Sequence, residues 1–120
     1  MILIVDDHLD TGSVLARMLK KCGHDAVAVG SGAAALELLK TTRPSVIVLD
    51  IMMPGMNGLD VLDRVRADAV TRDVPVVVFS ADYAFDTARK ARELGAREYV
   101  VKGTVGWVEV CDIIARYSAA

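Results

Sequence analysis

Polar side chains follow four apolar stretches of this 120-residue chain, directly at the point where each stretch ends. In chain order they are Asp6 with Asp7, Asp50, Ser80 and Lys102. Carboxylates held close together repel one another unless a cation joins them. Oxygen ligands without thiolates suit a hard ion such as Mg²⁺, and the lysine adds a fixed positive charge. These residue types could together bind a phosphoryl group and, through a carboxylate, accept it.

Asp50 is the strongest candidate for the reacting residue. It follows the apolar run 46–49, which is bounded by Pro44 before it and by Pro54 and Gly55 after it, so the run predicts a short strand buried on both faces. A carboxylate placed directly after the last core residue emerges at the carboxyl edge of the sheet. Open α/β sheets bind their ligands at that edge.

The elements that would position these residues alternate along the chain. The expected strands are residues 2–5, 25–29, 46–49, 75–79 and 98–101. The expected helices run over 9–22, from about 32 to the Arg43–Pro44 pair, from 58 to a charged connector at 68–73, over 84–94, and from 104 onward. The central strands are continuous apolar runs, which predicts a parallel sheet covered by helices on both faces.

The last helix is expected to begin after Thr104, which can serve as its N-cap. Val108, Cys111 and Ile114 are then predicted to face the core, because they recur at helical spacing. Cys22 lies in a similar apolar pattern in the first helix. Two separated cysteines of this kind indicate small, reduced core residues.

Composition limits the class of protein. A chain of this length matches one domain, and 53% hydrophobic residues exclude intrinsic disorder. No apolar run approaches the ~20 residues of a membrane span. A net charge of −2 argues against a nucleic-acid-binding surface. No basic segment precedes the first strand, so no signal peptide is expected and the predicted location is the cytoplasm.

The motifs, taken in this order, resemble a receiver domain of the two-component response regulators over the whole chain. They are the Asp6–Asp7 pair, Asp50 followed by the loop MMPGMNG, Ser80 with Ala81, Gly95 with Ala96, and Tyr99 to Lys102. The resemblance implies a flavodoxin-like (βα)5 three-layer sandwich with strand order 2-1-3-4-5. It also implies that residues 1–120 form a single receiver domain with no effector domain in this chain.

The resemblance implies that Asp50 accepts a phosphoryl group from a phosphohistidine on a sensor histidine kinase or a histidine phosphotransfer protein. Asp7, Asp50 and the backbone carbonyl of Met52 would ligate Mg²⁺, with Mn²⁺ as a possible substitute, and Asp6 would act through water. His8 is expected to be an exposed loop imidazole, since Mg²⁺ prefers oxygen ligands.

The same resemblance implies roles for the other strand-end residues. Lys102 would pair with Asp50 at rest and with the phosphoryl group afterwards, which Ser80 and Ala81 would also contact. Ser80 and Tyr99 would then switch the face built from the fourth helix, fifth strand and fifth helix. That face could bind a second copy or a downstream partner.

Two residues would face the water that removes the phosphoryl group, namely Met52 and Asp82. The resemblance also implies a switch with slow, magnesium-dependent self-dephosphorylation and not a dedicated enzyme. One position departs from the family, which usually has proline after the lysine where this chain has Gly103. A cis bond before glycine costs about 2.5–4 kcal/mol, so a trans bond is expected here.

Three alternatives use the same layout. The stretch from Asp6 to Gly12 partly matches the cobalamin signature D-x-H-x-x-G, but the glycine comes one residue late. An aspartyl-phosphate phosphatase would need a second acid where Met52 stands. The third alternative is a receiver-like module that binds partners without being phosphorylated.

Overall fold

Five short strands form the centre of the molecule in the computed structural model, which describes residues 1–118. They are β1 (Ile2–Val5), β2 (Ala26–Val29), β3 (Val46–Leu49), β4 (Val76–Ser80) and β5 (Glu98–Val101). All pair in parallel, in the order β2-β1-β3-β4-β5. The predicted flavodoxin-like fold and its strand order are confirmed.

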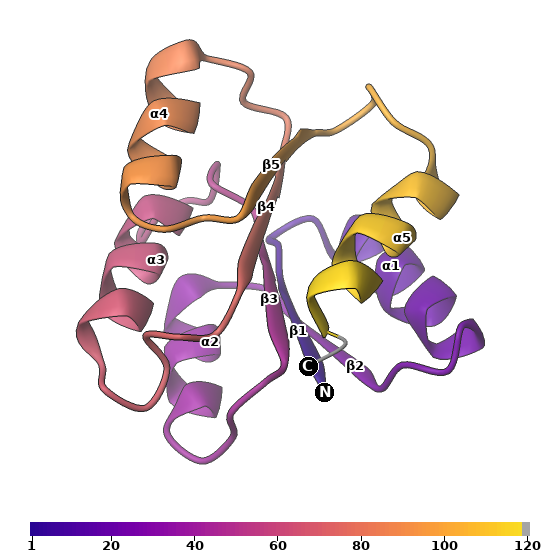
Figure 1. Cartoon of the computed structure of the whole chain (residues 1–120), viewed down its shortest axis with the longest axis horizontal. Coiled ribbons are helices and arrows are strands. Elements are labelled where there is room, and N and C mark those ends of the chain that lie inside the picture. The colour runs from indigo at the N-terminus through magenta and orange to yellow at the C-terminus, as the bar shows by residue number, and fades with distance from the viewer. Residues whose placement is uncertain (119–120) are drawn as a thin grey trace.

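Five helices cover the two faces of this sheet. They are α1 (Leu9–Lys21), α2 (Gly32–Leu39), α3 (Gly58–Ala67), α4 (Phe85–Glu93) and α5 (Trp107–Ser118). Helices α2, α3 and α4 lie on one face, and α1 and α5 lie on the other (Figure 1). The molecule is therefore the expected three-layer sandwich.

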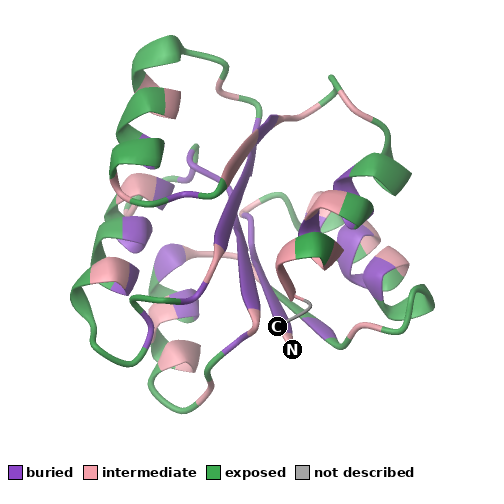
Figure 2. Ribbon diagram, in the orientation of Figure 1, coloured by how far each residue is buried: buried purple, intermediate pink, exposed green. Residues whose placement is uncertain are grey.

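The strands at the centre of the sheet are buried along their whole length. Every residue of β1, β3 and β4 is buried, as Figure 2 shows, because helices cover both faces of these strands. A separate apolar cluster fills the space on each face. The sheet is thus a rigid support for the residues at its edges, and only the outer strand β2 exposes residues in its middle, Val27 and Ala28.

Helix α5 differs from the prediction. It begins at Trp107, so Thr104 is not its N-cap, and the Thr104 hydroxyl instead donates to the carbonyl of Val101 at 2.7 Å. The inward stripe consists of Val110, Cys111 and Ile114, with Trp107 one turn before Val110. Val108 is 67% exposed because it lies about 100° around the helix from Trp107, outside that stripe.

The prediction for the two cysteines is half right. Both are free thiols, and Cys111 is buried in the core, whereas Cys22 is exposed where α1 ends. Burial raises the pKa of the Cys111 thiol. In the part of the chain that the structure describes, no helix combines the length and the apolar character that a bilayer crossing requires.

A half-buried cation holds the amino edge of the sheet, which is the edge where the parallel strands begin. Arg66, near the end of α3, donates to four backbone carbonyls. They belong to Arg72 (2.9 Å), Val74 (2.7 Å), Leu94 (3.2 Å) and Gly95 (2.9 Å). One side chain therefore ties α3 to the segment before β4 and to the turn before β5.

Candidate functional site

Three strand ends bring opposite charges together at the carboxyl edge of the sheet. The Lys102 ammonium donates to Asp6 Oδ2 at 2.7 Å and to Asp50 Oδ2 at 3.3 Å. Asp6 and Asp50 are only 3% and 2% exposed. The expected contact between Lys102 and Asp50 is present, but Asp6 is the nearer partner of the lysine.

Asp50 is fixed by backbone contacts on both sides. Its N–H donates to the carbonyl of Val5 at 2.9 Å, and its Oδ1 accepts from the N–H of Met52 at 3.1 Å. The N–H of Gly58 donates to the carbonyl of Ile51 at 3.0 Å. Glycine is required at position 58, because a Cβ there would collide with the backbone of Asp50 and Ile51. The start of α3 thus packs directly against the strand end that carries Asp50.

The loop after β1 contributes Asp7 and His8. Asp7 Oδ1 is buried and has no hydrogen-bond partner in the described part of the chain. His8 is the N-cap residue of α1, and its backbone N–H donates to Asp6 Oδ1 at 2.8 Å. The imidazole is 64% exposed, as expected, but its Nδ1 lies only 3.2 Å from that same Asp6 oxygen. The sequence analysis did not predict that the His8 ring lies beside these carboxylates. The signal in the sequence that could have indicated it is that His8 directly follows the two acids at the end of β1.

The residues of this cluster fit a divalent cation. Three carboxylates and one ammonium leave two negative charges, which a divalent ion would neutralise. The unpartnered Asp7 oxygen is one acceptor that such an ion would satisfy. Asp6, Asp7, His8 and Asp50 each offer a ligand atom, and all of these atoms lie within 4.8 Å of one another.

Lys102 reaches the cluster although a glycine follows it. The bond between Lys102 and Gly103 is trans, as expected, and Gly103 adopts a left-handed conformation with φ of +85°. The Lys102 ammonium lies over the ring of Phe79, 5.6 Å from the ring centroid. Trp107 packs edge-on against the same ring at 6.0 Å. The aromatic pair supports the lysine from the side of α5.

A chain of hydrogen bonds leads from the end of β4 to β5. The buried Ser80 hydroxyl accepts from the N–H of Asp82 at 3.2 Å, and the Tyr99 hydroxyl donates to the carbonyl of Asp82 at 2.7 Å. Burial, followed by the charges of Asp82 and Asp50, raises the pKa of Tyr99 to about 12. Ser80 and Tyr99 are thus connected through the backbone of one residue.

The two residues expected to face attacking water lie at the mouth of the site. Met52 is 55% exposed and lines a shallow pocket of about 390 Å³ with Ala81 and Asp82. The Asp82 carboxylate accepts from the N–H of Ala84 at 2.8 Å. One of its oxygens is therefore committed to the loop that leads into α4.

This sheet order, with an acidic cluster and a lysine at the carboxyl edge, defines a receiver-type α/β domain. The fold is shared with the solved chemotaxis protein CheY4 of Vibrio cholerae at a TM-score of 0.89 and 22% identity, covering 97% of this chain and 96% of that chain. The sequence model described as the response regulator receiver domain matches residues 2–106. The chain belongs to this family.

Two curated relatives show the same membership. The sensory/regulatory protein RpfC of Xanthomonas campestris pv. campestris is 36% identical over 115 residues, which is 94% of this chain and 16% of RpfC. The DNA-binding response regulator MtrA of Mycolicibacterium smegmatis is 38% identical over 101 residues, which is 84% of this chain and 43% of MtrA. The chain thus spans less than half the length of these relatives.

Membership in the family settles the general character of the domain. Receiver domains are phosphoacceptor switches and not classical enzymes, and they bind a divalent metal at their acidic pocket. They interact with histidine kinases or phosphotransfer proteins. Because the chain belongs to the receiver family, the cobalamin-binding and phosphatase alternatives are not retained.

Proposed function

We propose that Asp50 accepts a phosphoryl group from a phosphohistidine of a sensor histidine kinase or a histidine phosphotransfer protein. The observation that carries this proposal is the position of the Asp50 carboxylate, buried at a strand end with its Oδ2 3.3 Å from the Lys102 ammonium. A carboxylate oxygen would form the new P–O bond as the P–N bond to the donor imidazole breaks. Positioning and charge neutralisation supply most of the catalysis in such a transfer.

Asp7, Asp50 and the backbone carbonyl of Met52 would hold Mg²⁺, or Mn²⁺ in its place, and Asp6 would contact it through water. The ion supplies positive charge next to the phosphoryl oxygens. The unpartnered Asp7 oxygen and the excess of two negative charges support this assignment.

Lys102 would pair with a phosphoryl oxygen once Asp50 is modified, because its ammonium already lies within hydrogen-bond reach of the Asp50 carboxylate. The Ser80 hydroxyl and the backbone of Ala81 would contact the remaining oxygens. Ser80 is fully buried at the end of β4, which keeps its hydroxyl on the side of the site.

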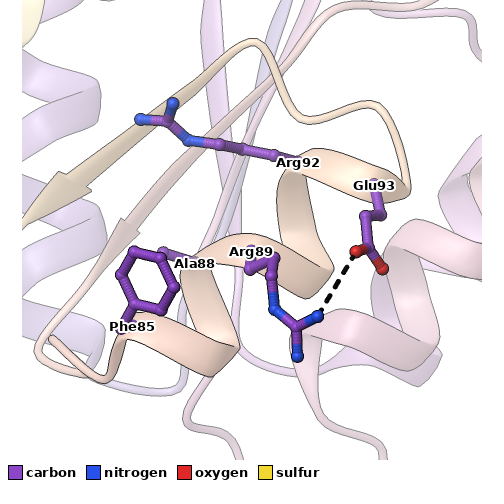
Figure 3. A pocket seen from close by; sticks show the side chains of 5 residues that line it. All are labelled: Phe85, Ala88, Arg89, Arg92 and Glu93. Atoms are coloured by element: carbon purple, nitrogen blue, oxygen red, sulfur yellow. Dashed lines mark ion pairs between the residues drawn. The ribbon is translucent and has the colours of Figure 1, made fainter.

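The output would be a change in the face formed by α4, β5 and α5. Movement of Ser80 would act on Asp82, whose carbonyl holds the Tyr99 hydroxyl, and the loop of Asp82 leads directly into α4. A pocket of about 560 Å³ lies on α4 and is lined by Phe85, Ala88, Arg89, Arg92 and Glu93 (Figure 3). A second copy of the domain or a downstream partner would bind this face.

Self-dephosphorylation would be slow. Met52 offers no group that orients water, and one carboxylate oxygen of Asp82 is held by the N–H of Ala84. We further propose that residues 1–120 act as one receiver domain in the cytoplasm, without direct contact of this domain with nucleic acid or membrane.

The proposal is tested by the intact mass of the protein after incubation with acetyl phosphate and Mg²⁺. We expect one phosphoryl adduct on the wild type, and none on Asp50→Asn or with excess EDTA. The variant Asp63→Asn is the matched control, since Asp63 is an exposed acid of α3 and should leave the adduct intact. Absence of an adduct with both acetyl phosphate and a phosphorylated histidine donor would contradict the proposal and favour the phosphorylation-independent interaction module.

A further inference from the structure

We infer that His8 is an additional protein ligand at the acidic cluster, so that the site also takes a late first-row divalent ion such as Co²⁺, Ni²⁺ or Zn²⁺. This inference rests on the proposed metal-binding role of the site and extends it to the identity of the ion. The carboxylate oxygens of Asp6, Asp7 and Asp50 are ligands that Mg²⁺ prefers, whereas the imidazole nitrogen of a histidine is a preferred ligand of later transition metals.

The distances around His8 Nδ1 match those between neighbouring ligands of one ion. Nδ1 lies 3.2 Å from Asp6 Oδ1, 3.3 Å from Asp7 Oδ1 and 3.8 Å from Asp50 Oδ2. Metal bonds of about 2.0–2.2 Å place adjacent ligand atoms roughly 3–3.5 Å apart. One ion could therefore contact the imidazole and two carboxylates with small adjustments of the side chains.

The backbone holds the base of His8 in this position. Its N–H donates to Asp6 Oδ1 at 2.8 Å, and the residue is the N-cap of α1 with extended backbone angles (φ −82°, ψ 96°). The ring is 64% exposed, so it can also turn toward water. Its placement next to the acids is a consequence of the fold, because the turn from β1 into α1 directs both Asp7 and His8 to the carboxyl edge.

Asp7 supplies a second observation. Its Oδ1 is buried and makes no hydrogen bond, although His8 Nδ1 is only 3.3 Å away. An ion bound between them would satisfy both atoms at once. A hydrogen bond from the imidazole would satisfy only Asp6.

The ligand set then has two kinds of donor with different ion preferences. The oxygens of Asp7, Asp50 and Met52 serve Mg²⁺, which gains little from an imidazole. A later ion gains a nitrogen ligand from His8, in line with the general rise in affinity from Mn²⁺ to Cu²⁺. His8 thus strengthens the preference of the site for later divalent ions beyond that of an all-oxygen site.

Calorimetric titration of the whole chain with Co²⁺ and with Mg²⁺ tests this inference. In His8→Ala we expect the affinity for Co²⁺ to fall at least about tenfold, since even outer-shell changes at metal sites have effects of that size. The affinity for Mg²⁺ should change by a much smaller factor. His24→Ala is the matched control, because it removes the other histidine of the chain and should change neither titration.

A spectroscopic measurement identifies the ligand directly. The proton NMR spectrum of the Co²⁺-loaded wild type should contain strongly shifted imidazole ring signals, which His8→Ala removes and His24→Ala retains. Equal Co²⁺ affinity in wild type and His8→Ala, or shifted signals that belong to His24, would overturn the inference. These measurements do not involve phosphoryl transfer, so their failure is distinct from the absence of a phosphoryl adduct on Asp50.

Discussion

Lys102 and Arg66 are cations fixed at opposite edges of the same sheet, but their partners differ in kind. At the carboxyl edge Lys102 contacts the carboxylates of Asp6 and Asp50, and with Asp7 the negative charges outnumber the positive one. At the amino edge Arg66 contacts four neutral backbone carbonyls. Burial, followed by the nearby Arg97, lowers the pKa of Arg66.

We expect this difference in partners to separate a structural cation, Arg66, from a functional one, Lys102. The carbonyls around Arg66 belong to the main chain and have no other role, so the contacts persist as long as the fold does. The carboxylates around Lys102 would be free to exchange the ammonium for a metal ion, and phosphorylation of Asp50 would replace its carboxylate by a more negative phosphoryl group. At the carboxyl edge the negative carboxylates outnumber the positive lysine. We therefore expect that edge, and not the amino edge, to bind a further ion or group.

Removing the carboxyl-edge cation tests this contrast most severely. In Lys102→Met we expect the rate of phosphoryl adduct formation on Asp50 to fall by about 10²–10³-fold, the range for loss of one preorganised donor at a reacting group. The free energy of unfolding without divalent ions should fall as well, because the buried carboxylates of Asp6 and Asp50 lose their ammonium partner. Added Mg²⁺ should restore part of the lost unfolding free energy. Intact-mass kinetics measure the rate of adduct formation, and urea unfolding measures the stability.

Lys90→Met is the control for Lys102→Met, since Lys90 is an exposed lysine of α4. An unfolding free energy of Lys102→Met that is indifferent to Mg²⁺ would show that the carboxylates do not depend on a cation. Lys102 would then be a structural cation, as Arg66 is.

Removing the amino-edge cation is the reverse experiment. Arg66→Ala leaves four carbonyls without their donor, and we expect the free energy of unfolding to fall by about 2–3 kcal/mol. Phosphoryl transfer to the folded fraction should stay at the wild-type rate. Arg64→Ala, an exposed change in the same helix, should leave stability nearly unchanged. A slower transfer in Arg66→Ala under fully folded conditions would mean that the two edges are coupled.

The turn after Lys102 gives a smaller effect. Gly103→Ala places a side chain at φ of +85°, and we expect a loss of about 1 kcal/mol in the free energy of unfolding. The space around position 103 is open, so the effect comes from the backbone alone. Gly103→Asn is the matched control, because asparagine tolerates the left-handed conformation better than alanine does. Equal stabilities of the two variants would argue against a strained turn.

The smallest predicted effect concerns Tyr99. Its pKa is raised to about 12 by burial and by the charges of Asp82 and Asp50, so the folded state favours the neutral phenol. This contribution is fully present below the unfolded pKa of about 10 and is lost as the pH rises through about 12. Unfolding curves measured across this alkaline range should therefore show a fall in stability that Tyr99→Phe reduces.

Tyr83→Phe is the control for the alkaline titration, because Tyr83 is 85% exposed in the loop before α4. It should keep the wild-type dependence on pH. Tyr117 adds to the same fall, since its hydroxyl donates to Glu98 and its pKa is also raised. An unchanged alkaline fall in Tyr99→Phe would mean that the phenol does not hold the carbonyl of Asp82 in solution.

Much of the fold could be predicted from the sequence because it depends on local patterns. Buried parallel strands are continuous apolar runs, and their ends are marked by the first polar residue. For that reason Asp50 and Lys102, which are far apart in the chain, could both be assigned to the carboxyl edge from the pattern of the strands alone.

The rest depends on contacts that leave no local pattern. Arg66 was not predicted to be structural, because its partners are carbonyl groups, which every residue possesses. The first turn of α5 was misplaced, since Thr104 is a plausible N-cap and only packing shows that the helix begins at Trp107. The place of His8 in the cluster depends on the direction of the turn from β1 into α1. The sequence shows His8 only as a polar residue of a loop and does not give that direction.

The close approach of Gly58 to Asp50 has a mechanical consequence. The start of α3 touches the backbone of Asp50 and Ile51 without a side chain between them, so this side of the site is stiff. The opposite side, from Ser80 to α4, is joined by single hydrogen bonds and is compliant by comparison. We therefore expect strain introduced at Asp50 to be relieved toward α4, because the contact with Gly58 resists displacement on the other side.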